Sequence, residues 1–180
     1  MTTMELAPER AIEILERTPA VLRSLLEGHD ESWLTYDEGP GTWSPFDIAA
    51  HLIHCEEEDW VPRFKIMIEA GESRPFDPFD PEGFRTRYAA LDIEERLARF
   101  ERGRAINLEW LASQPLDAAQ IALRGVHPEF GSVSFGEMLA TWAVHDRTHI
   151  AQISRVMCRQ YERAVGPWVK YFPIFPRRSQ

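Results

Sequence analysis

The chain has 180 residues, of which 44% are hydrophobic and 27% are charged, and these are the proportions of an ordinary globular protein. That length suits one core, so we expect residues 1–180 to form a single domain. The formal net charge of −9 argues against a surface that binds nucleic acid.

Signals for export or membrane insertion are not apparent in the sequence. The first twenty residues carry acidic side chains and no continuous apolar run, which is unlike a secretory signal. No apolar stretch approaches the ~20 residues that a membrane-spanning helix needs. We therefore expect a soluble cytoplasmic protein without a membrane partner.

The two cysteines, Cys55 and Cys158, each lie in a predicted helix and do not form a closely spaced pair. This pattern predicts neither a disulfide framework nor a cysteine zinc site. We expect both to be reduced, partly buried small side chains. Cys55 lies one helical turn from His51, so it could border the same pocket as that histidine.

The first predicted helix covers residues 8–26. Pro8 occupies an N1-like position, apolar residues follow at helical spacing, and Gly28 ends the segment. Pro19 lies in the middle and should kink or restart the helix. The polar connection over residues 29–42 contains His29, which we expect to be a solvated surface residue.

The second predicted helix starts at a serine cap, Ser44, and ends near residue 70. We expect a bend at Pro62, because a proline inside a helix removes a hydrogen bond. His51 lies two turns into this helix. The acidic run at residues 56–58 is interpreted as a solvated face.

Residues 72–91 hold several prolines and cannot form a regular helix. We expect a long crossover loop pinned by Phe76, Phe79 and Phe84. The alternative is that this segment forms a lid over a pocket.

Two further helices are predicted, over residues 92–113 and from Ser134 to about Tyr161. The connection between them contains His127, which is either structural or overhangs a site. The aromatic tail at residues 166–175 should pack across the other helices or belong to a subunit interface.

Together these segments predict the fold class. The sequence shows no strand-like alternation of useful length and no internal repeat. Four long helices and one long connection indicate an all-α protein, an antiparallel four-helix bundle with a long crossover loop between helices 2 and 3.

His145 and His149 are the strongest functional signal, because four residues make about one helical turn and place both imidazoles on one face. Two such nitrogens can bind one divalent metal ion, and His51 on another helix could supply a third ligand. The alternative is that these are hydrogen-bonded core histidines without a metal.

A family resemblance adds to this interpretation. The residues that carry it are Trp43 and Ser44 at the start of the second predicted helix, His51 and Leu52 shortly after it, and His145 with His149 in the last helix. With them the chain resembles the DinB-like superfamily, which includes the YfiT-like metal-dependent hydrolases and the bacillithiol and mycothiol S-transferases.

The resemblance spans most of the chain and implies a four-helix bundle of the DinB/YfiT type. It also implies a divalent metal, zinc or nickel, held by His51, His145 and His149. A homodimer is expected from the resemblance and from the aromatic tail.

Other polar and aromatic side chains are candidates for the surroundings of the metal. His54 competes with His51 as the third ligand, but the family spacing from Trp43 favours His51, which leaves His54 as a pocket residue. Trp142 could wall the pocket or belong to the core, and Gln152 could orient a polar group.

Asp146 falls near the centre of the apolar stripe of the last predicted helix. An unpaired carboxylate there would be costly, so we expect Asp146 to be hydrogen-bonded, either to an arginine or to a backbone cap.

Three neutral imidazoles leave the two positive charges of an ion uncompensated, so water or a thiolate would complete the site. We therefore predict transfer of a low-molecular-weight thiol to an electrophilic substrate, with a small-molecule thiol and an electrophile as partners. One alternative is a metal-dependent hydrolase that uses metal-bound hydroxide. Another is a non-catalytic, metal-binding homodimeric stress or interaction protein.

Overall fold

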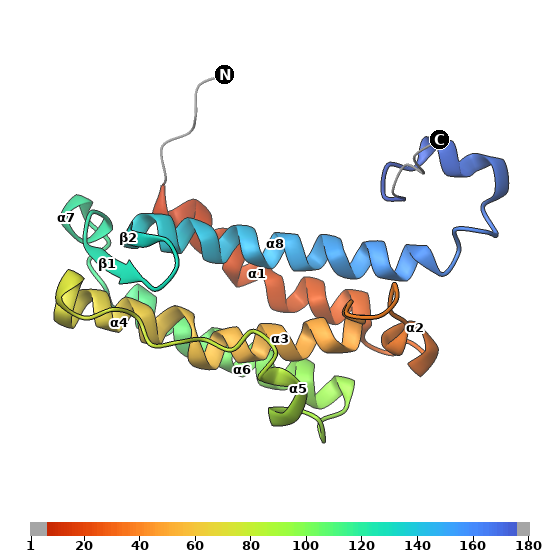
Figure 1. Ribbon diagram of the computed structural model, residues 1–180, viewed down its shortest axis with the longest axis horizontal. Coiled ribbons are helices and arrows are strands. Elements are labelled where there is room, and N and C mark those ends of the chain that lie inside the picture. Colours follow the sequence, from red (N-terminus) through yellow and green to blue (C-terminus); the bar gives the residue numbers. More distant parts are fainter. Residues whose placement is uncertain (1–6, 176–180) are drawn as a thin grey trace.

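Four long helical segments lie side by side in the computed structural model, which describes residues 7–175 (Figure 1). The first and last run in one direction, and the two between them run in the opposite direction (Figure 1). This arrangement confirms the predicted four-helix bundle. The segments are α1 (Pro8–Leu26), α3 with α4 (Pro45–Glu58 and Trp60–Ala70), α6 (Ile93–Ala112) and α8 (Phe135–Arg159).

The second and third segments run in the same direction, so the chain must return along the bundle between them. The segment after α4 makes this return, and it contains a 3-10 turn, η1 (Gly71–Ser73), and a short helix, α5 (Phe84–Arg87) (Figure 1). Phe76 and Phe84 are buried and anchor the segment to the bundle. The predicted long crossover is therefore confirmed, while its role as a lid stays a prediction.

The second predicted helix is two helices, and the break lies at Asp59 instead of Pro62. Asp59 has φ −112° and ψ −70°. In a continuous helix the ring of Pro62 would clash with the carbonyl of Glu58. Pro62 also has no backbone N–H to donate to that carbonyl. The chain breaks directly after Glu58, which places Pro62 in the first turn of α4, where its missing N–H is not needed.

α1 runs as one helix through Pro19, so of the two expectations from the sequence, a kink or a restart, the restart is wrong. Pro19 has no N–H to donate to the carbonyl of Leu15. That carbonyl instead accepts a hydrogen bond from Nη1 of Arg104, at 2.8 Å. Because an unpaired buried carbonyl would cost about 1–3 kcal/mol, this bond allows α1 to continue through the proline.

Arg104 is the centre of a buried polar network that joins α1, α3, α6 and α8. Its guanidinium lies 2.6 Å from Asp146 Oδ2 and 2.7 Å from Glu56 Oε1. Glu56 also accepts hydrogen bonds from Asn107 and from the indole of Trp142. Asp146 thus has the arginine partner that we expected. The acidic run is not a solvated face at Glu56, which is 3% exposed.

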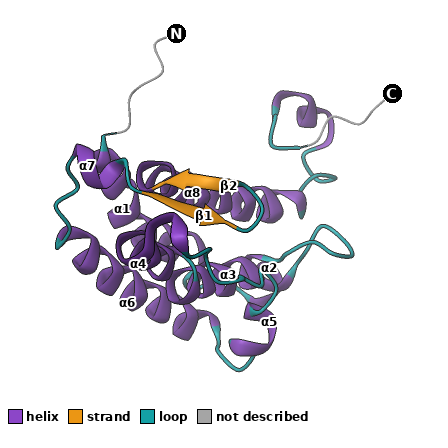
Figure 2. Ribbon diagram, turned by 60° about the vertical axis from the view of Figure 1, so that its left-hand side comes forward, coloured by secondary structure: helices purple, strands orange, loops and turns teal. Residues whose placement is uncertain are grey.

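A β-hairpin that was not predicted from the sequence lies between α6 and α8. Its strands, β1 (Arg124–His127) and β2 (Gly131–Ser134), pair antiparallel near the C-terminal end of α4 and the start of α8 (Figure 2). Each strand has four residues, which is too short for an alternating pattern to stand out. The N–H of Phe76 donates to the carbonyl of Val126 and ties the crossover to the hairpin.

Two further short helices lie in the connections, α2 (Glu31–Thr35) before α3 and α7 (Ala118–Ile121) before the hairpin. The aromatic tail does not pack across the bundle, because η2 (Gly166–Tyr171) curls beyond the end of α8 (Figure 1). Trp168 and Tyr171 are 64% and 63% exposed. Its role in a subunit interface stays a prediction.

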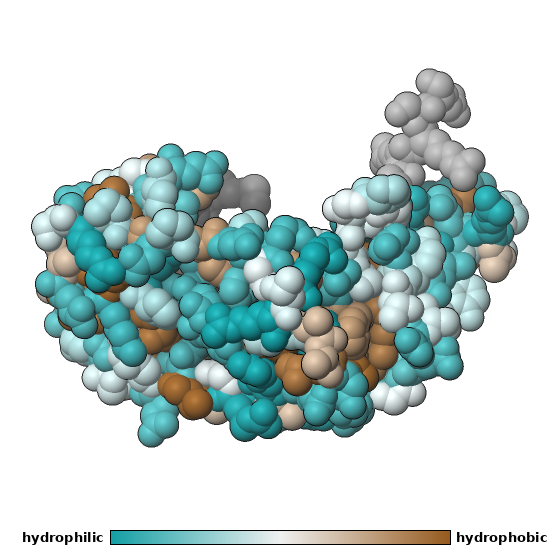
Figure 3. Space-filling model, turned by 60° about the horizontal axis from the view of Figure 1, so that its bottom comes forward, coloured by the Kyte–Doolittle hydropathy of each residue, from teal (hydrophilic) through white to brown (hydrophobic). Residues whose placement is uncertain are grey.

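The face of the molecule in Figure 3 is mostly hydrophilic, with apolar patches between the polar side chains. Over residues 7–175, no helix combines the length and apolar character needed to cross a membrane.

Candidate metal centre

Three histidines meet between α3 and α8. Nε2 of His145 lies 3.2 Å from Nε2 of His51 and 3.1 Å from Nε2 of His149. The capping box at Ser44 starts α3 two turns before His51, and the four-residue spacing in α8 aligns the other two rings. The structure therefore brings all three predicted ligands together.

The separations of Nε2 of His145 from the other two Nε2 atoms match those expected around a divalent ion. Zinc binds histidine nitrogens at about 2.0–2.1 Å in tetrahedral sites, which places neighbouring nitrogens about 3.3 Å apart. The ligand atoms of His51, His145 and His149 all lie within 4.8 Å of one another. Three unprotonated nitrogens that face each other bring their lone pairs together, and a shared cation would stabilise that arrangement.

Burial keeps the three imidazoles neutral at physiological pH. It lowers the pKa of His51 to about 3 and that of His145 to about 2, with the nearby His149 contributing in both cases. Burial also lowers the pKa of His149, although a hydrogen bond to Gln152 and the charge of Asp146 oppose this shift. Neutral imidazole is the form that binds a metal, so the cluster is ready for a cation at neutral pH.

Gln152 fixes the orientation of His149. Its Oε1 lies 2.8 Å from Nδ1 of His149, and both residues belong to α8. When Nδ1 donates its hydrogen to this oxygen, Nε2 is left unprotonated and faces the other two histidines. Gln152, which we predicted as a pocket residue, therefore contacts one of the predicted ligands directly.

Trp43 covers the histidines from the start of α3. The centroid of its ring lies 4.6 Å from that of His51 and 6.0 Å from that of His149. The indole N–H donates to Glu82 Oε1 at 2.9 Å, and Glu82 belongs to the crossover segment. The crossover thus holds one aromatic wall of the site in place.

Trp60 and Phe84 form two further walls. The ring of Trp60 lies 5.2 Å from that of His145, and the ring of Phe84 lies 5.9 Å from that of His51. Trp142 is fully buried and stacks on Trp60, so it lies behind the wall as a core residue. These two walls were not predicted from the sequence, because Trp60 follows the helix break and Phe84 lies in the crossover, where periodicity does not predict orientation.

His54 lies outside the three-histidine cluster. Its Nε2 is 3.0 Å from the carbonyl of Asp80, and its ring stacks on Phe79 at 4.9 Å between centroids. Both partners belong to the crossover. His54 lines a separate cavity of about 320 Å³ between this segment and the α3–α4 region.

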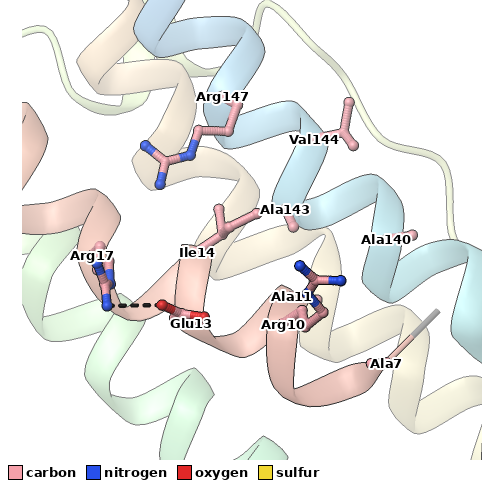
Figure 4. Close-up of a pocket in the computed structure, with 10 residues that line it drawn as sticks. All are labelled: Ala7, Arg10, Ala11, Glu13, Ile14, Arg17, Ala140, Ala143, Val144 and Arg147. Carbon is pink, nitrogen blue, oxygen red and sulfur yellow. Dashed lines mark ion pairs between the residues drawn. The ribbon is translucent and has the colours of Figure 1, made fainter. Parts of the chain in front are cut away.

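A groove of about 450 Å³ lies between α1 and α8 (Figure 4). Ile14 and Val144 give it apolar lining, while Arg17 and Arg147 add positive charge. Arg17 forms an ion pair with Glu13 at 2.8 Å (Figure 4). None of the three histidines lines this groove, so it is separate from the candidate metal centre.

Comparison with known proteins places this geometry in a family context. The family model of the DinB superfamily matches residues 14–153, a range that includes the three histidines. A protein of Oceanobacillus iheyensis named "putative metal-dependent hydrolase" is 24% identical over 151 residues. That match covers 83% of this chain and 85% of the relative.

Two solved structures are similar to this fold. YfiT from Bacillus subtilis, described as a probable metal-dependent hydrolase with an unusual four-helix bundle topology, has a TM-score of 0.75 and 21% identity over 89% of this chain and 91% of its own. TT2238, described as a four-helix bundle protein, has a TM-score of 0.56 and 24% identity over 82% of this chain and 98% of its own. The structural matches support the fold, and the family model spans most of the bundle and all three histidines. The chain therefore belongs to the DinB superfamily.

Proposed function

We propose that the protein is a metal-dependent enzyme that transfers a low-molecular-weight thiol to an electrophilic small molecule. The observation that carries this proposal is the convergence of the Nε2 atoms of His51, His145 and His149. These residues would hold a divalent ion, with zinc or nickel as the candidates. When bound, such an ion supplies Lewis acidity, which lowers the pKa of a thiol or a water molecule that reaches it.

The residues around the cluster suit an apolar electrophile. Trp43, Trp60 and Phe84 line the histidines with aromatic rings. Such a lining would hold the apolar part of a substrate and exclude bulk water, which competes with a thiol as the nucleophile. Gln152 would keep His149 in its binding orientation throughout.

The proposed reaction makes modest demands on acid–base groups. The thiol sulfur forms a bond to the electrophilic carbon, the leaving group departs with its bonding electrons, and the thiol proton passes to solvent. Glu56 and Asp146, the buried carboxylates of α3 and α8, both bond to Arg104, and the buried Asp59, whose pKa burial raises to about 6, pairs with Arg63. Thiol transfer with a stable anionic leaving group suits this setting better than amide hydrolysis, which must protonate an amine.

Hydrolysis is the second candidate. It is favoured by the names of the Oceanobacillus protein and of YfiT, both of which refer to metal-dependent hydrolases. The same cluster of histidines would serve, with water as the nucleophile in place of a thiol.

The test is a conjugation assay on protein purified without a histidine tag and reconstituted with zinc or nickel. Bacillithiol and mycothiol are incubated with a bimane electrophile, and the S-conjugate is measured by mass spectrometry. His149→Ala removes a proposed ligand, whereas His29→Ala alters an exposed histidine outside the cluster. Metal-dependent conjugation in the wild type and in His29→Ala, but not in His149→Ala, is the expected result.

Two results would contradict the thiol-transfer proposal. Metal-dependent cleavage of ester or amide probes without consumption of thiol would indicate the hydrolase instead. A metal-loaded wild type with neither activity over a broad set of electrophiles and esters would refute both enzymatic proposals.

A further inference from the structure

A cysteine thiol lies against the histidine cluster. Sγ of Cys55 is 3.4 Å from Nε2 of His51 and 3.9 Å from Nε2 of His145. The side chain is 2% exposed. Packing as a small apolar side chain would explain the burial of Cys55, but it does not explain why the sulfur contacts two ring nitrogens that face a candidate metal position.

The spacing of the donor atoms is repeated on the two facing helices. His51 and Cys55 are four residues apart in α3, and His145 and His149 are four residues apart in α8. Residues at this spacing share a face of a helix. Two facing helices therefore bring the Cys55 sulfur against two of the three clustered histidines, and bundle cores commonly build metal sites from side chains on facing helices.

A bound divalent ion would favour a thiolate at this position, whereas without the ion burial and the nearby carboxylates of Asp59 and Glu56 raise the pKa of the Cys55 thiol. The three imidazoles bring no negative charge to a divalent ion, and both Glu56 and Asp146 are committed to Arg104. The distances from Sγ to His51 and His145 are also suitable, although Cys55 lies outside the group of mutually close donor atoms that the three histidines form. Zinc–sulfur and zinc–nitrogen bonds of about 2.3 Å and 2.0–2.1 Å in a tetrahedral site give sulfur–nitrogen separations of about 3.5 Å.

We propose that Cys55 is the fourth protein ligand of the ion held by His51, His145 and His149. This inference rests on the proposed function and deepens it, because it makes the resting site a Cys–His₃ centre that prefers thiophilic ions such as zinc over magnesium or manganese. Zinc sites can expand from four to five ligands, so a fourth protein ligand is compatible with the proposed chemistry.

Cobalt(II) is the probe for this proposal, because it replaces zinc and its absorption spectrum reports the ligands. Visible bands report four-coordinate binding, and a near-ultraviolet charge-transfer band reports a thiolate. The variants are Cys55→Ser and, as the matched control, Cys158→Ser, which alters the other cysteine, half-buried in α8. Circular dichroism checks the fold, and Cys55→Ala repeats the test without a hydroxyl.

The expected result is a charge-transfer band in the wild type and in Cys158→Ser that is lost in both Cys55 variants. Cobalt binding should weaken by roughly tenfold or more in Cys55→Ser, because loss of even an outer partner of a metal ligand costs about 10–100-fold. Cobalt-loaded wild type without the band, or a Cys55 variant that keeps it, would overturn the inference and leave the metal centre intact. Failure of the folded wild type to bind cobalt at all would instead refute the three-histidine centre and the proposed function with it.

Discussion

Replacement of Arg104 by methionine is expected to be among the most destabilising single substitutions in this chain. The guanidinium is 1% exposed and donates to Asp146, to Glu56 and to the carbonyl of Leu15. Methionine keeps much of the side-chain volume but has no donor to offer. The substitution therefore leaves two buried carboxylates and one buried carbonyl without this partner.

The magnitude follows from these contacts. Loss of one partner of a buried ion pair costs about 3–5 kcal/mol, and an unsatisfied buried carbonyl adds roughly 1–3 kcal/mol. We expect Arg104→Met to lower the free energy of unfolding by at least about 4 kcal/mol. Because a domain of this kind has only about 5–15 kcal/mol in total, such a loss approaches global unfolding.

Urea denaturation of the metal-free protein, followed by far-ultraviolet circular dichroism, measures this loss. The matched control is Arg102→Met on the same helix, where the side chain is exposed and the expected change is within about 0.5 kcal/mol. Should Arg104→Met not fold, Glu56→Gln provides a milder test with an expected loss of about 1–3 kcal/mol, because Arg104 keeps Asp146. An Arg104→Met protein within about 1 kcal/mol of the wild type would refute the reasoning.

Two further predictions concern the histidines. Gln152→Leu is expected to weaken zinc binding about 10–100-fold, because Nδ1 of His149 loses its hydrogen-bond acceptor. Competition with a chelator measures the affinity. An unchanged affinity would mean that packing alone orients the ring of His149. His145→Asn should reduce the loss of stability on acidification of the metal-free protein. Burial lowers the pKa of His145 to about 2 in the folded chain, whereas in the unfolded chain it takes the ordinary value of 6.5. Between these two pH values only the unfolded chain binds the proton. The contribution of neutral His145 to the free energy of unfolding is present above about pH 6.5 and falls by up to about 1.4 kcal/mol per pH unit below it. Urea titrations between pH 7 and pH 5 measure this free energy. The same slope against pH in the variant and the wild type would contradict the prediction.

The helix starts could be predicted because their signals are local. Ser44, where the sequence predicted a cap, forms a capping box with the residue three positions later, and Asp92 and Ser134, where the sequence predicted the next two helices to start, do the same. The continuity of α1 through Pro19 could not be predicted in this way. It depends on Arg104, which is 89 residues away from the carbonyl that it satisfies.

The candidate site shows the same division between local and distant information. The shared face of His145 and His149 follows from their spacing on one helix, while the meeting with His51 was implied by the packing of family members. Glu56 was assigned to a solvated face because its partner Arg104 lies 48 residues further along the chain. Burial of a charge depends on such distant partners, which hydrophobic periodicity does not reveal.

Metal content is the most direct test of the account. Elemental mass spectrometry is applied to wild-type protein purified without a histidine tag, to His149→Ala, and to His29→Ala as the control outside the cluster, with circular dichroism to check each fold. We predict near-stoichiometric divalent metal in the wild type and in His29→Ala, and its loss in His149→Ala. A folded wild type that retains no zinc, nickel, iron or manganese after reconstitution would contradict the assignment of His51, His145 and His149 as metal ligands.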